Sequence, residues 1–152
     1  RRAGGGMLPG MTSLPTTTAP LTSGASIPLL GFGTWQLTGD TATAATATAL
    51  SVGYRHLDTA TVYGNEGEVG AALRESGVPR DEVFVTSKVP PSEAARARQV
   101  LETSLRLLGV DALDLWLIHW TEDGADRKVD VEIDFRRGNI VLGRAWATFV
   151  MP

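Results

Sequence analysis

The sequence predicts an α/β fold in which parallel strands alternate with helices. Apolar runs typical of strands begin near Leu29, Tyr54, Val83 and Asp114, and a helical pattern follows each of the first three. Glycine or proline ends each helical pattern, and one strand with its helix takes about 30 residues. Parallel neighbours need a crossover long enough to hold a helix, and this spacing provides it. Periodicity alone leaves an open doubly wound sheet and a closed barrel as alternatives.

Two segments precede the first of these strands. Residues 1–11 are expected to be a leader or upstream read-through, because Met7 and Met11 offer alternative starts. Residues 12–27 mix β-branched threonines with a Ser-Gly turn, which predicts a short hairpin. The main domain is therefore expected over residues 12–120.

The first helix is predicted to begin after Asp40, which is a suitable N-cap residue. Gly53 suits the left-handed position just beyond the helix end. Between them, small and apolar residues recur at spacings of three and four, namely Ala42, Ala45, Ala49 and Val52.

The second and third helices have similar boundary signals. Asn65 can cap the second, and Gly77 followed by Pro79 ends it. Ser92 opens the third, and Gly109 ends it. Their apolar stripes are Val69, Ala72 and Leu73 in the second helix, and Ala94, Ala97, Leu101, Leu105 and Leu108 in the third.

Composition excludes several classes of protein. The chain has no cysteine and only two histidines, His56 and His119, so a metal centre is not expected. A net charge of −3 gives no basic surface for nucleic acid, and no apolar run of about 18 residues predicts a membrane span. We expect a cytoplasmic protein with neither nucleic acid nor membrane as a partner.

Glycines near the first two strands do not form a nucleotide-binding motif. Gly31 and Gly33 follow an apolar run, but Gln36 stands where a dinucleotide fingerprint has its third glycine, which disfavours an open-sheet Rossmann enzyme. A second group lacks the following Lys-Ser/Thr of a P-loop and is expected to serve turns and close packing: Gly64, Gly67 and Gly70.

Polar side chains terminate three of the predicted strands. Alternation places Asp58, Lys88 and His119 on one face of their strands, and Tyr63 lies on the loop after Asp58. If the strands are parallel neighbours, these groups meet at one rim, where α/β enzymes carry catalytic residues. His56 shares the parity of Asp58 but lies deeper, so we interpret it as a hydrogen-bonded core histidine. The opposite parity of Trp116 predicts packing against the helices.

The four groups have complementary chemistry. Asp58 can pair with Lys88, and the ammonium of Lys88 beside Tyr63 stabilises a phenolate and so helps the phenol to donate its proton. His119 can hydrogen-bond a carbonyl oxygen or Tyr63. None of these groups supplies a hydride or an electron, so a reduction would need a nicotinamide cofactor.

Four motifs carry a resemblance to a known family. GFGTWQ, YRHLDTATVYGNE, VFVTSK and DLWLIHW are similar, in order and spacing, to the strand-end motifs of the aldo-keto reductases. The resemblance covers residues 29–120, about the N-terminal half of such an enzyme. It implies four β/α units of a (β/α)8 TIM barrel that binds NADPH without a Rossmann fold and reduces aldehydes or ketones.

The resemblance also implies individual roles. Tyr63 would be the general acid, assisted by Lys88 and Asp58, and His119 would orient the carbonyl. Gly33, Thr34 and Asp58 would approach the nicotinamide and its ribose, and Trp35 and Trp120 would line the substrate pocket. The residues that would bind the 2′-phosphate of NADPH are not among these motifs. NADH is therefore an alternative cofactor.

Residues 121–152 do not resemble the family's continuation. Apolar and charged residues alternate over 129–135 and a Gly-Asn turn follows, which predicts a β-hairpin. A complete barrel takes about 250 residues, so a truncated and weakly active or inactive reductase is expected. A frameshift, premature end or faulty gene model is favoured over an authentic adapted tail.

The main rival function is a non-catalytic binding module. Four parallel strands expose an unpaired edge, and such an edge favours self-association. The two hypotheses are therefore a reductase acting on a small aldehyde or ketone, and a half-barrel that dimerises.

Overall fold

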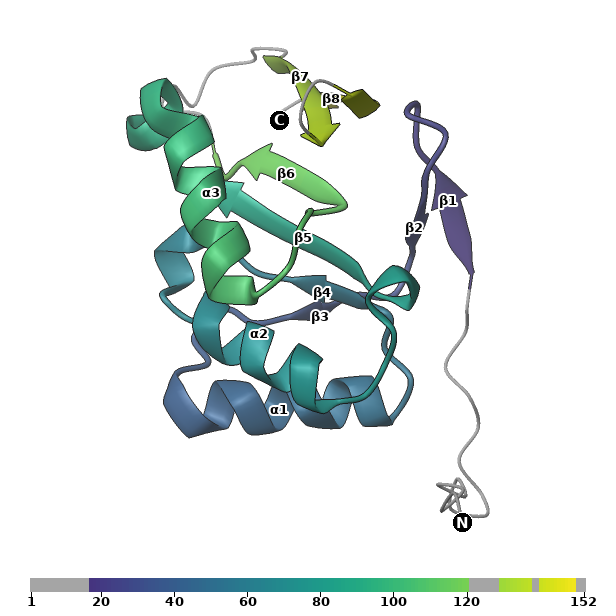
Figure 1. The fold of residues 1–152 in the computed structure, drawn as a ribbon, viewed down its shortest axis with the longest axis vertical. Helices are drawn as coiled ribbons and strands as arrows, with labels where there is room; N and C mark the ends of the chain where they lie inside the picture. Colours follow the sequence, from purple (N-terminus) through teal and green to yellow (C-terminus); the bar gives the residue numbers. More distant parts are fainter. Residues whose placement is uncertain (1–16, 121–128, 138–139, 150–152) are drawn as a thin grey trace.

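The computed structural model describes residues 17–120, 129–137 and 140–149. Its main element is a parallel sheet whose four strands lie side by side in chain order (Figure 1). The predicted leader, 1–11, lies outside the described residues. The predicted α/β class is confirmed. The strands are β3 (Phe32–Gly33), β4 (His56–Asp58), β5 (Phe84–Val89) and β6 (Leu115–Ile118).

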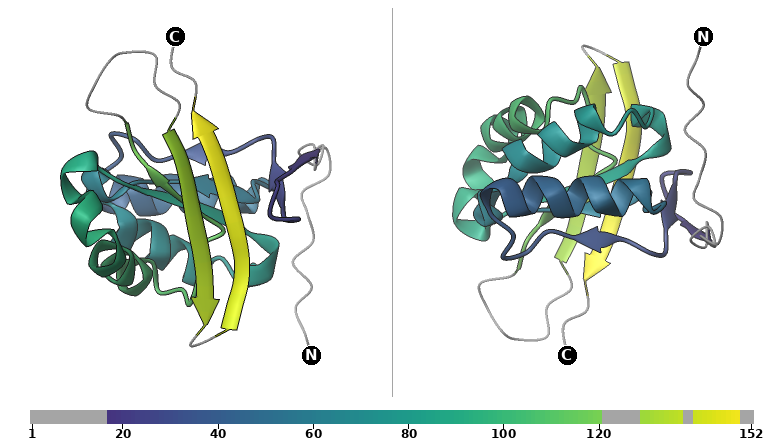
Figure 2. Two further views of the ribbon diagram at one scale, coloured as in Figure 1. Left: turned by 90° about the horizontal axis from the view of Figure 1, so that it is seen from above. Right: turned by 90° about the horizontal axis from the view of Figure 1, so that it is seen from below.

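Three α-helices cover one face of this sheet, as the views from above and below show (Figure 2). The first begins after Thr38, whose extended backbone is the N-cap, two residues before the predicted cap Asp40. The third begins later than predicted, because residues from Pro91 onward first form a 3-10 turn. The helices are α1 (Gly39–Ser51), α2 (Glu66–Glu75) and α3 (Ala97–Leu108), and the 3-10 turns are η1 (Thr61–Tyr63), η2 (Arg80–Glu82) and η3 (Pro91–Arg96).

The predicted glycine stops are confirmed by backbone conformation. Gly53, Gly77 and Gly109 follow the three helices with φ angles of 106°, 69° and 67°. A residue with a Cβ atom rarely adopts this left-handed region, so glycine ends each helix at low cost.

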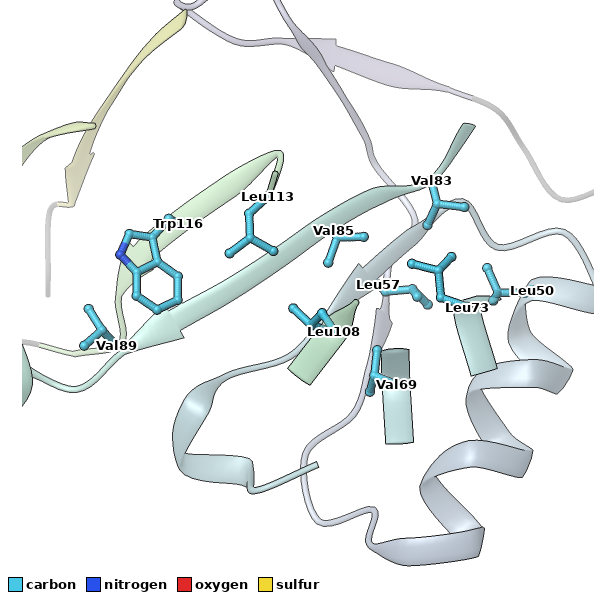
Figure 3. Packing of buried hydrophobic residues seen from close by; sticks show 10 residues of the cluster. All are labelled: Leu50, Leu57, Val69, Leu73, Val83, Val85, Val89, Leu108, Leu113 and Trp116. Atoms are coloured by element: carbon cyan, nitrogen blue, oxygen red, sulfur yellow. The ribbon is translucent and has the colours of Figure 1, made fainter. Parts of the chain in front are cut away.

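The hydrophobic core lies between the sheet and the helices (Figure 3). Leu57 and Val85 are fully buried from the sheet side, and Trp116 packs with them, as its parity predicted. Their neighbours along the strands, including Asp58 and Lys88, therefore lie on the opposite face. The cluster consists of Leu50, Leu57, Val69, Leu73, Val83, Val85, Val89, Leu108, Leu113 and Trp116.

Two antiparallel hairpins accompany the sheet. β1 (Thr18–Pro20) pairs with β2 (Ser26–Pro28), which confirms the N-terminal hairpin, with its second strand one residue beyond the predicted 12–27. β7 (Val129–Arg137) pairs with β8 (Ile140–Phe149), and the predicted Gly-Asn turn between them lies outside the described residues. In the part of the chain that the structure describes, no helix has the length and apolarity to cross a bilayer.

Candidate active site

The carboxyl ends of the four parallel strands form one rim. The register pairs Gly33 with Asp58 across β3 and β4, and Lys88 with Leu117 across β5 and β6. His119 directly follows β6, and its backbone N–H donates to the carbonyl of Val89 at 2.8 Å. The short strands thus bring side chains from four separate segments to the same end of the sheet.

Asp58 and Lys88 form an ion pair at this rim. Lys88 Nζ lies 2.8 Å from Asp58 Oδ1 and also donates to the carbonyl of Thr59 at 3.0 Å. The Lys88 side chain is only 14% exposed and that of Asp58 is 35% exposed, so the pair is partly shielded from water. Two of the three ammonium donors are engaged, which holds the positive charge in one place.

Tyr63 lies between this ammonium and His119. Lys88 Nζ is 5.5 Å from the centre of the Tyr63 ring, and the Tyr63 hydroxyl is 3.3 Å from His119 Nε2. The Tyr63 and His119 rings meet edge to face, with centroids 5.3 Å apart. The phenol therefore has a cation beside its ring and an imidazole at its hydroxyl.

Burial lowers the pKa of His119 below its ordinary value, and the nearby positive charge of Lys88 lowers it further, while Asp58 opposes the shift. The imidazole is therefore neutral at neutral pH. Its buried Nδ1 has no hydrogen-bond partner among the described residues. A neutral imidazole can either accept from or donate to an oxygen at Nε2, according to its tautomer.

Two exposed tryptophans flank the polar groups. Trp35 is 60% exposed and its ring lies 4.8 Å from that of Tyr63. Trp120 is 45% exposed and lies 4.8 Å from the His119 ring. Large apolar surfaces left open beside polar groups are typical of ligand-binding walls.

Gly33 and Thr34 differ in how they border the rim. Gly33 is exposed, and a side chain built on it would meet no atom of the described residues within 4 Å, so this part of the structure leaves the backbone next to Asp58 open to a ligand. This open backbone beside a half-exposed carboxylate is compatible with a nicotinamide ribose. Thr34 is fully buried, and its hydroxyl donates to the carbonyl of Asp58 at 3.3 Å, so its side chain serves the protein itself.

His56 lies away from this group and is hydrogen-bonded on both sides. Its Nε2 is 3.0 Å from Thr86 Oγ1 and its Nδ1 is 3.3 Å from the carbonyl of Pro28. Burial lowers its pKa. These contacts confirm that the histidine is hydrogen-bonded, but it is only partly buried and lies outside the hydrophobic core cluster. No group of three or more potential metal ligands occurs among the residues that the structure describes.

Sequence reasoning missed two buried polar residues that support the rim. Asn65 is the N-cap residue of α2, as predicted, but its side chain makes no cap hydrogen bond and donates to the carbonyls of Thr34 and Leu37. Glu66 is buried and accepts hydrogen bonds from Ser87 and Ser104. Both residues end the YRHLDTATVYGNE motif, but their local signal was only that of two polar residues at the start of an amphipathic helix.

The fold and the rim define a barrel-type α/β protein with polar side chains at its strand ends. The profile of the aldo/keto reductase family matches residues 29–133, and the chain belongs to this family. The match continues beyond Trp120, where the predicted resemblance ended.

Individual relatives agree with this assignment. An aldehyde reductase of Saccharomyces cerevisiae is 44% identical over 113 residues, which cover 74% of this chain and 36% of the relative. An aldo/keto reductase structure from Brucella melitensis is 44% identical with a TM-score of 0.68, covering 72% of this chain and 43% of that one. A Bombyx mori aldo-keto reductase in complex with NADP is 34% identical with a TM-score of 0.64, covering 69% and 38%.

These similarities confirm the predicted partial (β/α)8 barrel. The chain spans less than half the length of these three relatives. The matched part is the one that holds the strand ends described above.

Proposed function

We propose that this chain carries the proton-transfer part of an NADPH-dependent carbonyl reductase that acts on small aldehydes or ketones. The observation that carries the proposal is the contact between the Tyr63 hydroxyl and His119 Nε2, 3.3 Å apart, beside the ion pair of Asp58 and Lys88. A phenol flanked by an imidazole and an ammonium is suited to protonate a carbonyl oxygen. Similarity to an aldehyde reductase supports the same reaction.

Each of the four side chains has a distinct part in the proposed reaction. Tyr63 donates its hydroxyl proton to the carbonyl oxygen as the general acid. The Lys88 ammonium stabilises the negative charge left on Tyr63, and Asp58 holds that ammonium through the 2.8 Å ion pair. His119, neutral because burial lowers its pKa, hydrogen-bonds the substrate oxygen. A nicotinamide cofactor, when bound, supplies the hydride that these groups lack.

The proposed cofactor contacts are Gly33 and Asp58, at the adjoining ends of β3 and β4. Thr34, which the resemblance also implies, is fully buried, so we propose that it supports these two residues from within the protein. The open backbone of Gly33 and the half-exposed carboxylate of Asp58 support this part of the proposal. The NADP complex of the Bombyx mori relative favours NADPH over NADH. Trp35 and Trp120 are the proposed walls of the substrate pocket. The absence of cysteine suits a reducing compartment, so we propose the cytoplasm.

The test compares NADPH oxidation in the presence of a small aldehyde by the wild-type chain and by Tyr63→Phe. Loss of a general acid lowers kcat by about 10²–10⁴-fold, and we expect a fall of this order. Tyr54→Phe, which changes the only other tyrosine, is the matched control and is expected to keep the wild-type rate. The wild-type rate is expected to be low, because the chain spans less than half the length of its relatives. A measurable rate that is equal for wild type and Tyr63→Phe would contradict the proposal.

A second candidate function is self-association through the β3 side of the sheet. Among the described residues, β3 has a strand neighbour on one side only. Beside it, Phe32, Tyr54 and the outer face of α1 line a shallow apolar groove of about 680 Å³. An unpaired strand edge next to an apolar surface favours contact with another chain.

Light scattering tests this candidate. A discrete dimer is expected for the wild type, and Ala44→Arg, which places a charge in the groove, is expected to give monomers. Leu107→Arg changes an exposed residue on α3 and should leave the dimer intact. A monomeric wild type would rule this function out.

A further inference from the structure

Asn65 is the most fully bonded polar side chain at the rim, although no sequence motif assigned it a role there. It is completely buried. Its Nδ2 donates to the carbonyl of Thr34 at 2.8 Å and to that of Leu37 at 2.9 Å. Its Oδ1 accepts from the hydroxyl of Thr59 at 2.9 Å. The Thr34 hydroxyl lies 3.5 Å from the same oxygen and shares its one proton between Oδ1 and the carbonyl of Asp58. Both donor hydrogens and at least one acceptor position of the amide are used, and every partner lies outside helix α2.

The two donor bonds of Asn65 reach both ends of one tight turn. Leu37 N–H donates to the carbonyl of Thr34 at 3.2 Å and closes residues 34–37 into this turn. Within it, Gln36 has a φ of 63°, a left-handed conformation that residues with a Cβ atom rarely adopt. Such a conformation persists when surrounding contacts determine it. The Asn65 amide provides these contacts.

The turn presents Trp35 to the proton donor. Trp35 lies in the middle of the turn, and its ring is 4.8 Å from that of Tyr63 at a tilt of 56°. Because Trp35 is largely exposed, side-chain burial contributes little to this placement. The backbone of the turn must therefore direct the indole toward Tyr63.

We propose that Asn65 is a positioning residue that fixes the 34–37 turn and thereby holds Trp35 against Tyr63. Its bond with Thr59 ties this turn to the segment after β4, which leads to Tyr63. The consequence for substrate binding rests on the function proposed above: Asn65 sets the distance between the pocket wall and the acid. The contact itself does not depend on that function.

Nuclear Overhauser contacts between the Trp35 and Tyr63 rings test the proposal in the full chain. With two tyrosines and four tryptophans, Tyr63→Phe and Trp35→Phe suffice to assign the signals. The wild type is expected to show these contacts, and Asn65→Ala to lose them while the remaining spectrum stays that of a folded protein. Ser104→Ala removes another buried side-chain hydrogen bond, to Glu66 on the helix side of the sheet, and should keep the contacts.

Retention of the Trp35–Tyr63 contacts in folded Asn65→Ala would overturn the proposal. If Asn65→Ala does not fold, hydrogen exchange of the wild-type side-chain amides decides. Slow exchange of the Asn65 amide relative to that of exposed Gln99 supports the clamp, and equally fast exchange overturns it. Neither measurement uses cofactor or substrate, so failure here is distinguishable from failure of the reductase assay.

Discussion

The charge of Lys88 acts on the other three rim residues, Asp58, Tyr63 and His119. It forms the ion pair with Asp58, lies 5.5 Å from the centre of the Tyr63 ring and lowers the pKa of His119. One ammonium therefore contacts both the carboxylate and the phenol ring, and it favours the neutral form of the imidazole. The catalytic roles of these residues stay predictions, whereas their proximity is a property of the fold.

The pKa of His119 is expected to respond in opposite directions to two substitutions. Lys88→Met removes a positive charge and should raise the pKa toward 6.5, whereas Asp58→Asn removes a negative charge and should lower it further. Proton NMR titration can follow both imidazoles, since the chain has only two histidines. Shifts of the same sign in the two variants would contradict the electrostatic account.

The same lowered pKa has a consequence for stability. His119 binds a proton more weakly in the folded chain than in the unfolded chain. Above its ordinary pKa of 6.5 the imidazole is neutral in both states, so its titration does not change the free energy of unfolding there. As the pH falls below 6.5 toward the lower native pKa, the unfolded state gains protons first and the fold is destabilised.

Packing between α2 and α3 depends on a residue without a side chain. A Cβ atom on Gly70 would overlap the backbone of Leu108 at the end of α3. Close approach of the two helices brings Ser104 within 3.1 Å of Glu66, so the buried carboxyl depends on the same contact. One helix–helix interface therefore accounts for both Gly70 and the buried Glu66.

Gly70→Ala and Gly67→Ala should change stability with opposite signs. Alanine is the better helix former, and at Gly67, where a Cβ meets nothing within 4 Å, we expect stabilisation by about 0.5–1 kcal/mol. At Gly70 the overlap with backbone outweighs this gain, and we expect a net loss of about 1–3 kcal/mol. Urea unfolding of both variants checks the pair. A stabilised Gly70→Ala would show that the helices can separate at little cost.

Glu66 should make stability depend on pH. Burial raises the pKa of this carboxyl, and the hydroxyls of Ser87 and Ser104 oppose the shift. Its contribution is therefore fully present below the ordinary value of 4.5 and is lost as the pH rises through the higher native pKa. Glu66→Gln keeps the shape but not the titration, so its Tm relative to wild type should increase with pH above 4.5.

Melting curves of wild type and Glu66→Gln between pH 4 and 8 provide the measurement. Ser104→Ala is the companion variant, because it removes a hydrogen bond that favours the charged carboxylate of Glu66. This variant is expected to lose more stability than the wild type does as the pH rises. A difference in Tm that stays constant with pH would contradict the assignment.

At the scale of the whole molecule, the sheet separates two environments. The helices cover one face and enclose the apolar cluster (Figures 1 and 3). Alternation along β4 and β5 places His56, Asp58 and Lys88 on the other face. The stability of the described part depends on the covered face, because the apolar residues there are the ones removed from water. The chemistry depends on the other.

Leu57→Ala is expected to destabilise the whole fold. Leu57 is completely buried in the middle of β4, and removing its side chain leaves a cavity that costs about 2–5 kcal/mol. Leu107→Ala, at a position 48% exposed on α3, is expected to cost less than about 0.5 kcal/mol. Unfolding free energies from urea titration compare the two. Similar losses would mean that the cluster does not form one core.

The sequence by itself determined the parallel α/β order, the glycine ends of the helices and the outward packing of Trp116. It also indicated that Asp58, Lys88 and His119 would terminate neighbouring strands. These features follow from periodicity and backbone conformation, which act over a few residues. Two helix starts were wrong, because several polar residues near each boundary could serve as caps.

Only the tertiary structure decided the surroundings of Asn65, Glu66 and Thr34. Asn65 bonds to a turn about 30 residues earlier in the chain, and Glu66 bonds to Ser104 on another helix. A buried polar group requires partners, but local sequence does not specify which distant segment provides them. The sequence therefore predicts Asn65 only as a helix cap. Its side chain can bond to the 34–37 turn because the folded sheet places β3 and β4 side by side.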